Sequence, residues 1–375
     1  MTATDTATSR AARLLGRPFD INGLSLRNRI AMAPMTREFS PDGVPGADVA
    51  EYYARRAAGG VGLIVTEGTY VDHDSAGGSH RVPRFHGEAA LAGWRRVAEA
   101  VHAAGGRIVP QLWHIGTDRD QGQGPVPAAP SVGPSGLGLD GDTKGHTMTG
   151  ADIDDVIKAF ADSAAAAERI GFDGVELHGA HGYLIDQFLW SRTNRRTDGY
   201  GGDLASRTRF AAEIVEAVRA AVSPSFPVIF RLSQWKAYAF DAKLATDPAE
   251  LEALLAPLSA AGVDAFHAST RRYWLPEFEG DDLNLAGWVK KLTGKATLSV
   301  GSVGLDKEFV GPQGFAKESA STGIDLLLDR MERDEFDVIA VGRALIADPE
   351  WANKALTDRL DEVTPYDAGM LRRLA

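Results

Sequence analysis

Eight short runs rich in Val, Ile and Leu recur along the chain and constrain its fold more than any other feature. Each run is continuously apolar rather than alternating, which is typical of strands buried on both faces of a parallel sheet. We predict strands at residues 30–33, 61–66, 107–112, 174–178, 227–232, 265–268, 296–300 and 337–341.

Amphipathic segments separate most of these runs. We predict helices at residues 47–58, 88–104, 151–170, 203–222, 248–261 and 285–292. Thr149 and the Asp247-Pro248 pair are helix start signals, and Gly171 and Gly262 stand where helices should end. Strands that alternate with helices in this way predict right-handed βαβ units closed into a (β/α)₈ TIM barrel of the α/β class. The alternative is an open doubly wound sheet, but no Gly-x-Gly-x-x-Gly follows the first strand.

The predicted barrel forms one domain over residues 1–375, with residues 1–12 as a flexible N-terminal tail. Two connections are long, one at residues 116–149 after the third strand and one at residues 301–335 after the seventh. Long loops in compact folds are often functional lids, so we expect both to cap the barrel mouth.

Composition excludes several classes of function. The net charge of −11 argues against a nucleic-acid surface or an anionic membrane face as a partner. The chain has no cysteine, which excludes disulfides, thiolate metal sites, cysteine nucleophiles and cysteine-bound iron–sulfur clusters. Residues 1–10 do not resemble a signal peptide and no apolar stretch is long enough to span a membrane, so we expect a cytoplasmic location.

The segment 178–183, HGAHGY, ends the fourth predicted strand. Active sites of TIM barrels lie at the carboxyl ends of their strands. The imidazoles of His178 and His181 can donate hydrogen bonds to a substrate oxygen, and the phenol of Tyr183 is protonated at neutral pH and can deliver a proton. A metal site is the alternative, but zinc usually needs a third protein ligand and the helical His-Glu-x-x-His pattern is absent.

Two further sets of strand-end residues suggest anion binding. Gly301, Ser302, Gly342 and Arg343 follow the seventh and eighth strands, where barrels of this kind commonly bind phosphate; otherwise Arg343 simply faces solvent. Arg231 follows the fifth strand and needs an anion, either a charged ligand or a structural partner such as Glu176 or Asp264.

Taken together, these strand ends resemble the old yellow enzyme family of FMN-dependent NAD(P)H:flavin oxidoreductases, or ene reductases, which includes 12-oxophytodienoate reductases. The likeness runs from about residue 14 to residue 351. The matching segments are 26–37 (LRNRIAMAPMTR), 66–69 (TEGT), 111–114 (QLWH), 129–131 (APS), 171–183 (GFDGVELHGAHGY), 194–202 (NRRTDGYGG) and 341–343 (VGR).

The resemblance implies a role for each candidate residue. The residues implied to contact the ring and ribityl parts of a non-covalent FMN are Pro34, Met35, Thr36, Gly68, Gln111 and Arg231, and those implied to hold its phosphate are Gly301, Ser302, Gly342 and Arg343. His178 and His181 would bind the substrate and Tyr183 would donate the proton. Trp113, Tyr273 and Trp274 are further substrate-contact candidates; the last two otherwise form a packed aromatic loop.

Some segments depart from the family pattern. Thr36 stands where one branch of the family has a Cys beside the flavin. The length and the lack of cysteine favour the family members without fused iron–sulfur and second flavin domains. Residues 233–236 (SQWK) and 270–280 are not general family motifs, which puts the usual substrate range in doubt.

The implied activity is reduction of electron-poor alkenes (enones, enals, maleimides and nitroalkenes) with NAD(P)H, by hydride transfer from flavin N5 and proton transfer from Tyr183. Two alternatives stay open: an FMN-binding or storage protein without turnover, and a phosphate-binding barrel lyase or isomerase. Against the latter, no Lys ends a predicted strand as a Schiff-base candidate. The sequence distinguishes neither NADPH from NADH nor a monomer from a homodimer.

Overall fold

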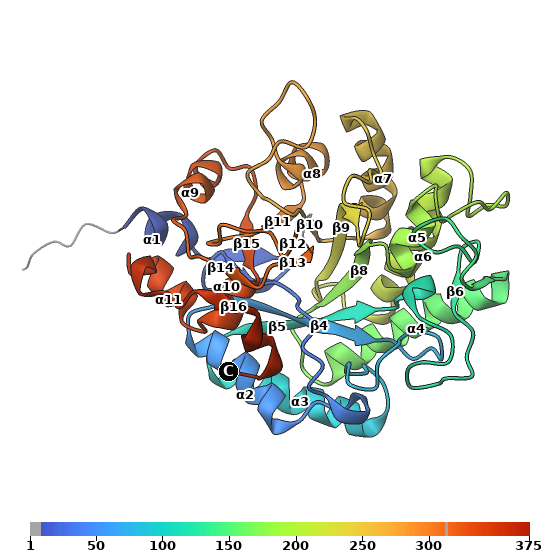
Figure 1. Ribbon diagram of the computed structural model, residues 1–375, viewed down its shortest axis with the longest axis horizontal. Helices are drawn as coiled ribbons and strands as arrows, with labels where there is room; N and C mark the ends of the chain where they lie inside the picture. The colour runs from blue at the N-terminus through green and yellow to red at the C-terminus, as the bar shows by residue number, and fades with distance from the viewer. Residues whose placement is uncertain (1–8, 312–313) are drawn as a thin grey trace, which may run out of the picture.

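Eight strands close into one parallel barrel (Figure 1). The computed structural model describes residues 9–311 and 314–375. Around the barrel the strands follow the order β10-β11-β15-β3-β4-β5-β8-β9, so neighbours in the barrel are also consecutive along the chain. Their bounds are β3 (Ile30–Met32), β4 (Leu63–Tyr70), β5 (Arg107–Trp113), β8 (Val175–His181), β9 (Val228–Lys236), β10 (Ala265–Ser269), β11 (Ala296–Val300) and β15 (Val338–Val341). This confirms the eight predicted strands and the TIM barrel, and excludes the open sheet.

Three strands run at least three residues past their predicted ends. β4, β8 and β9 run on to Tyr70, His181 and Lys236, although their last residues include polar side chains. Pairing continues there because the register shifts, between Val65 and Gly68 in β4 and between Gly179 and His181 in β8. The segment 178–181 is therefore the last part of a strand rather than a loop.

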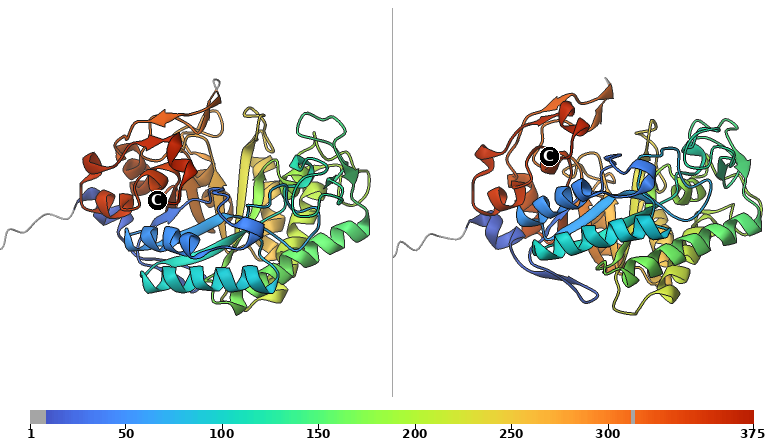
Figure 2. Two further views of the ribbon diagram at one scale, coloured as in Figure 1. Left: turned by 60° about the horizontal axis from the view of Figure 1, so that its bottom comes forward. Right: turned by 90° about the horizontal axis from the view of Figure 1, so that it is seen from below.

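Helices surround the barrel (Figure 2). The six predicted helices are confirmed to within one residue at each end, and the described part of the chain has five shorter α-helices that were not predicted. The helices are α1 (Arg10–Leu15), α2 (Ala47–Ala58), α3 (Glu88–Ala103), α4 (Gly150–Arg169), α5 (Leu184–Leu189), α6 (Leu204–Ala221), α7 (Pro248–Ala261), α8 (Leu285–Thr293), α9 (Asp325–Glu332), α10 (Arg343–Ala347) and α11 (Trp351–Leu356). The expected signals operate: Thr149 forms a capping box with Asp152, Asp247 caps α7, and Gly262 ends it in the left-handed conformation.

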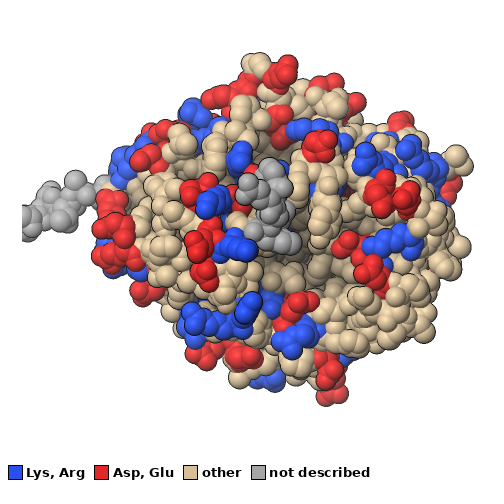
Figure 3. Space-filling model, in the orientation of Figure 1, with Lys and Arg blue, Asp and Glu red and all other residues tan. Residues whose placement is uncertain are grey.

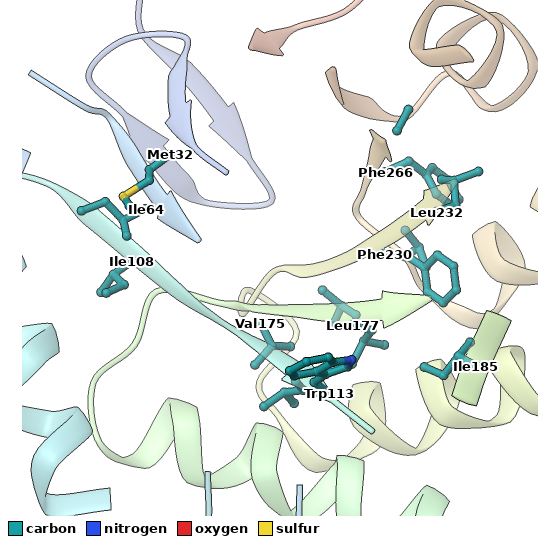
Figure 4. Close-up of a cluster of buried hydrophobic side chains, with 14 of the residues drawn as sticks. Met32, Ile64, Ile108, Trp113, Val175, Leu177, Ile185, Phe230, Leu232 and Phe266 are labelled. Carbon is teal, nitrogen blue, oxygen red and sulfur yellow. The ribbon is translucent and has the colours of Figure 1, made fainter. Parts of the chain in front are cut away.

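Side chains alternate between two cores because successive residues of a strand point to opposite faces. Met32, Ile64, Ile108 and Phe230 point outward and pack under the helices (Figure 4). Their neighbours Ala31, Leu63, Val65, Val109 and Ile229 fill the barrel interior.

A hairpin closes the amino-terminal end of the barrel. Strands β1 (Phe19–Ile21) and β2 (Leu24–Leu26) pair antiparallel. Ile21, Leu24 and Leu26 are buried against the first residues of barrel strands, such as Leu63 and Ala265. The carboxyl ends of the strands are left as the place for a ligand.

The chain start differs from the prediction. Helix α1 begins at Arg10, so residues 10–12 are helical instead of belonging to a tail. Arg10 donates to Asp329 (2.6 Å) and Glu332 (2.7 Å), both on α9, and Ala11 is buried. Residues 1–8 of the predicted tail lie outside the described residues.

The two long connections are present after β5 and β11. The first contains β6 (Val132–Gly133) and β7 (His146–Thr147), and the buried Arg119 fastens it by donating to the carbonyl oxygens of Gly77 (3.0 Å) and Ala129 (2.7 Å). The second contains β12 (Val310–Gly311), β13 (Gly314–Phe315) and β14 (Glu318–Ser319), the last paired with β16 (Tyr366–Asp367).

Two features of the whole molecule bear on partners. Basic and acidic side chains are intermixed over the face seen in Figure 3. Within residues 9–311 and 314–375, no helix is long and apolar enough to cross a membrane.

Candidate active site

A cavity of about 440 Å³ opens at the carboxyl ends of the barrel strands. This volume lies in the range typical of small-molecule and cofactor sites. The cavity brings together most of the residues singled out from the sequence. They are Pro34, Met35, Thr36, Gln111, Trp113, His178, His181, Tyr183, Arg231, Gly301, Ser302, Gly342 and Arg343.

The candidate residues form two groups on opposite sides of the mouth. In the barrel order, β15 lies four strands from β8 in either direction, and β11 lies four strands from β5. Gly301, Ser302, Gly342 and Arg343 follow β11 and β15, whereas His178 and His181 lie on β8. The arrangement leaves the width of the barrel between the predicted phosphate-binding residues and the histidines.

His178, His181 and Tyr183 form one aromatic wall with Trp113. The ring centroids of His178 and His181 are 5.2 Å apart, and those of His178 and Tyr183 are 5.0 Å apart, both pairs nearly perpendicular. Trp113 stacks on His178 at 6.0 Å and meets the Tyr183 ring edge-on at 4.8 Å. The three polar side chains therefore have fixed positions on one side of the cavity.

The backbone of His181 explains why both histidines face the cavity. In a regular strand, residues three apart point to opposite faces. Here the register shift after Gly179 and the left-handed backbone of His181 (φ +65°) break that rule. Ser233 Oγ accepts a hydrogen bond from the His181 N–H (2.9 Å), and the His181 carbonyl accepts one from Ala237 N–H (3.1 Å). Strand β9 and the residue after it thus hold the strained residue in place.

The surroundings set the protonation states. Burial lowers the pKa of His178 and of His181 well below the ordinary value, and the nearby Arg231 cation lowers each further. Burial raises the pKa of Tyr183, with a smaller contribution from Asp118. At neutral pH each imidazole is neutral with a single N–H, and the phenol keeps its proton.

Arg231 belongs to a buried polar network beneath the cavity. Its Nη2 donates to Ser269 Oγ (3.3 Å), and its Nη1 is 3.9 Å from Glu176 Oε1. Glu176 also binds His267 Nδ1 (2.6 Å) and Gln111 Nε2 (2.8 Å). Burial alone would raise the pKa of Glu176, but His267 and Arg231 outweigh it and hold that pKa below its ordinary value.

Neither acidic residue predicted as a structural partner binds Arg231 closely. Glu176 is a distant partner, and the other candidate, Asp264, is paired with Arg219 at 2.8 Å. Arg231 Nε has no partner among the described residues, and the side chain lines the cavity. The guanidinium therefore keeps donor capacity for a ligand.

The opposite end of the cavity is shaped by backbone and one arginine. A Cβ on Gly301 would lie 2.6 Å from Thr270 Oγ1 and 2.7 Å from its carbonyl oxygen, so this position requires glycine. Arg343 is buried, donates to the Lys307 carbonyl and lies 5.4 Å from the Tyr366 ring, which rules out the solvent-facing alternative.

Three predicted site residues do not line the cavity. A Cβ on Gly68 would be 2.4 Å from the Trp113 ring, so this glycine makes room for Trp113, and it is not among the residues that line the cavity. Tyr273 and Trp274 pack edge-to-face at 5.1 Å, and their carbonyls accept hydrogen bonds from Asn284 Nδ2 (2.7 Å) and Arg330 Nη2 (2.8 Å). Neither side chain lines the cavity, and both pack against the outer core, as the alternative of a packed aromatic loop predicts.

Several residues that line the cavity were not predicted from the sequence. Strand β9 and the segment after it rise beside the mouth (Figure 2) and bring Trp235, Tyr238 and Phe240 to it. Arg271 lines the same side and lies 4.2 Å from the Phe240 ring. The sequence signal that could have indicated them is residues 233–236 (SQWK). This segment departs from the family pattern and lies where β9 runs past its predicted end.

A lysine does end a strand, contrary to the prediction. Lys236 closes β9, but its Nζ is fully buried and donates to Asp186 Oδ1 (2.9 Å) and the Ser233 carbonyl (3.1 Å). It does not line the cavity, so it is no Schiff-base candidate. No group of three or more metal-ligating side chains is found within residues 9–311 and 314–375.

Glu67 fixes the segment that follows the cavity-lining residues 34–36. This buried carboxylate accepts hydrogen bonds at Oε2 from the backbone N–H groups of Arg37 (2.9 Å) and Glu38 (3.0 Å). The Arg37 side chain in turn donates to the Arg373 carbonyl (2.7 Å), near the cavity-lining Leu371. Glu67 thus supports two parts of the cavity wall.

We predict a pH-dependent stability at Glu67. Burial raises the pKa of Glu67 from 4.5 to about 7. Because the folded chain then binds this proton more tightly, the contribution to the free energy of unfolding is full below pH 4.5 and is lost as the pH rises through about 7. Glu67→Gln keeps an oxygen for both backbone bonds but cannot ionise, so it should remove this part of the pH dependence, roughly 3 kcal/mol.

Urea unfolding of the wild type, Glu67→Gln and the exposed neighbour Glu38→Gln, from about pH 5 to pH 8, measures the effect. The wild type and Glu38→Gln should lose stability relative to Glu67→Gln as the pH rises. If the free energy of unfolding changed with pH in the same way in the wild type and in Glu67→Gln, the raised pKa of Glu67 would not be the cause.

Comparison with known proteins decides the family. A sequence model of the NADH:flavin oxidoreductase / NADH oxidase family matches residues 15–362. The chain belongs to this family. The predicted resemblance to the old yellow enzymes is thereby confirmed, and the family is one of oxidoreductases described by their use of NADH and a flavin.

Individual members of the family are similar in sequence or structure. An NADH oxidase of Thermoanaerobacter brockii is 36% identical over 355 residues, which are 92% of this chain and 50% of that protein. The 12-oxophytodienoate reductase 7 of Oryza sativa subsp. japonica is 39% identical over 217 residues, 55% of each chain. The chain spans about half the length of these curated relatives. Morphinone reductase in complex with tetrahydroNAD has a TM-score of 0.80 at 29% identity, with 95% of this chain and 93% of that chain covered.

The cavity fits the family's flavin. Buried polar groups almost always have partners. Yet four cavity-lining residues carry a buried polar atom with no partner in the described chain: Trp113 Nε1, His178 Nδ1, Arg231 Nε and Arg343 Nη1. These four atoms are distributed along the cavity wall from β5 to α10, and two of them belong to arginines. A long polar ligand with an anionic end would satisfy them.

Proposed function

We propose that this chain is an FMN-dependent ene reductase, which uses NAD(P)H to reduce the C=C bond of electron-poor alkenes such as enones, enals, maleimides and nitroalkenes. The observation that carries the proposal is the wall of His178, His181 and Tyr183, which faces the cavity across from Arg343. The similarity to 12-oxophytodienoate and morphinone reductases supports it.

The residues that would hold FMN divide by chemistry. Pro34, Met35, Thr36, Gln111 and Arg231 would border its ring and ribityl chain, and Gly301, Ser302, Gly342 and Arg343 would hold its phosphate. When bound, FMN accepts a hydride from the nicotinamide and passes one to the alkene. Arg231, which donates to Ser269, would place a positive charge beside negative charge on the cofactor.

His178 and His181 would bind the carbonyl oxygen of the substrate. A neutral imidazole offers one N–H donor, and both rings line the same cavity, so each would donate to the substrate oxygen. Negative charge develops on this oxygen during reduction, so both bonds strengthen toward the transition state. Loss of one such donor typically raises the barrier by about 2.7–4 kcal/mol.

Tyr183 would protonate the α-carbon. Its ring is held between Trp113 (4.8 Å) and His178 (5.0 Å), so the hydroxyl has little freedom. The raised pKa keeps it in the acid form throughout the neutral range. Two donors on the oxygen and one acid for the carbon complete the groups that C=C reduction needs from the protein.

The test is a two-step reaction under anaerobic conditions. We expect the purified protein to contain FMN, NADPH or NADH to bleach it, and 2-cyclohexenone to restore the oxidised spectrum. Cyclohexanone, which lacks the C=C bond, should not restore it. Reoxidation by oxygen but by no member of a panel of enones, maleimides and nitroalkenes would contradict ene reduction.

A further inference from the structure

Strand β9 and the end of β10 enclose the ring of His181. The Trp235 ring lies against it, with centroids 4.4 Å apart and planes 31° from parallel. Trp235 Nε1 donates to the backbone carbonyl of Ser269 (3.2 Å), the last residue of β10. His181 Nε2 is 2.8 Å from Ser269 Oγ. Trp235 therefore packs against the face of the His181 imidazole, and Ser269 contacts its edge at Nε2.

The hydrogen atoms of this contact follow from the chemistry of the groups. Ser269 is buried (2% exposed), and its Oγ also receives Arg231 Nη2 at 3.3 Å. A guanidinium can only donate, so Ser269 is the acceptor there. Its own hydroxyl hydrogen then needs an acceptor, and among the described residues the atom in reach is His181 Nε2. Ser269 thus donates to Nε2.

The opposite arrangement has a cost. If His181 Nε2 carried the hydrogen, Ser269 Oγ would accept from both neighbours and its buried hydroxyl hydrogen would have no acceptor in the described chain. An unsatisfied buried donor is unfavourable. A neutral imidazole with a lone pair on Nε2 must carry its hydrogen on Nδ1.

Nδ1 is the nitrogen that matters for the substrate. It is neither buried nor hydrogen-bonded within the described chain, and His181 lines the cavity, so Nδ1 faces the open space. With hydrogen on Nδ1, His181 donates to an oxyanion; with hydrogen on Nε2, it would present a lone pair to that negative charge and repel it.

We propose that Ser269 and Trp235 are positioning residues that keep His181 in its Nδ1–H tautomer, and that Arg231 enforces this by occupying the acceptor side of Ser269. The inference rests on the proposed function for its purpose. It adds that the Ser269 hydroxyl connects Arg231, which is proposed to bind the cofactor, with His181, which is proposed to bind the substrate.

The first experiment reads the tautomer directly. The FMN-bound enzyme is labelled with ¹⁵N-histidine, and long-range ¹H–¹⁵N correlation spectra are recorded without any alkene, with the His181→Gln spectrum to assign the signal. We expect Nδ1–H in the wild type, in Ser269→Thr and in Ser163→Ala, which removes another buried serine hydroxyl, on α4. In Ser269→Ala the population should shift to Nε2–H. An Nε2–H tautomer in the wild type, or no shift in Ser269→Ala, would overturn the proposal.

The second experiment measures the consequence. Titration of the oxidised enzyme with a phenolate, a mimic of the substrate oxyanion, should give binding about 10–100-fold weaker in Ser269→Ala, the range for losing a hydrogen bond to a charged group. Ser269→Thr should restore most of it, and Ser163→Ala should match the wild type. Equal affinities in Ser269→Ala and the wild type would sink the proposed role. If the tautomer behaves as expected but no alkene is reduced, the proposed function fails and the tautomer assignment stands.

Discussion

Tyr183→Phe should slow enone reduction by about 10²–10⁴-fold, the usual contribution of a positioned general acid. The ring contacts with Trp113 and His178 survive the change, so the loss falls on proton transfer alone. Rapid-mixing measurements under anaerobic conditions separate the two half-reactions. The rate at which NADPH bleaches the flavin should change much less than the rate at which the enone restores it.

Two comparisons make this prediction specific to the proton. Tyr70→Phe removes a buried phenol that accepts from Gly78 N–H (3.3 Å) and does not line the cavity, so enone reduction should stay close to the wild-type rate. A nitroalkene should be less affected by Tyr183→Phe, because its nitronate product can leave without a proton from the enzyme. Wild-type enone reduction in Tyr183→Phe would show that another group is the acid.

Lys236→Met should lower the free energy of unfolding by about 3–5 kcal/mol, because it leaves the carboxylate of Asp186 buried without its partner. Both side chains are fully buried and meet at 2.9 Å. Asp186 also accepts from Gly182 N–H (2.6 Å), in the turn between His181 and Tyr183. Urea unfolding measures the loss, and a weakened phenolate titration should accompany it because the turn loosens.

Two variants define the origin of the effect. Lys236→Met with Asp186→Leu replaces both charges and should recover much of the stability, since a buried ion pair often gains little over apolar packing. Lys158→Met removes an exposed pairing with Asp162 and should leave stability near the wild-type level. If Lys236→Met were as stable as Lys158→Met, the pair would not be holding the turn.

Much of the fold was predictable because it rests on local patterns. The outward Met32 and inward Ala31 follow from strand periodicity, and the α4 start follows from a capping box within four residues. The active-site wall was predictable for a related reason. His178, His181 and Tyr183 lie within six residues, and the barrel places every strand end at the same mouth.

The errors have a common physical cause. Tyr273 and Trp274 follow a strand end as the true lining residues do, yet their carbonyls are bound by Asn284 and Arg330, and the loop turns outward. Gly68 was predicted to contact the cofactor. A side chain at this position would collide with the ring of Trp113 on the next strand, so the position needs glycine. In each case the deciding contact comes from another part of the chain, which local pattern does not show.

The sequence by itself determined the barrel, its open end and many of the polar groups at that end, because strand periodicity and strand-end position depend on residues close together in the chain. Only the tertiary structure decided how those groups are used. His181 faces the cavity through a register shift against β9, and its hydrogen is placed by Ser269, 88 residues further along the chain. The tautomer of His181 and the direction of its side chain are set by contacts between strands, and these contacts exist only once the barrel has closed.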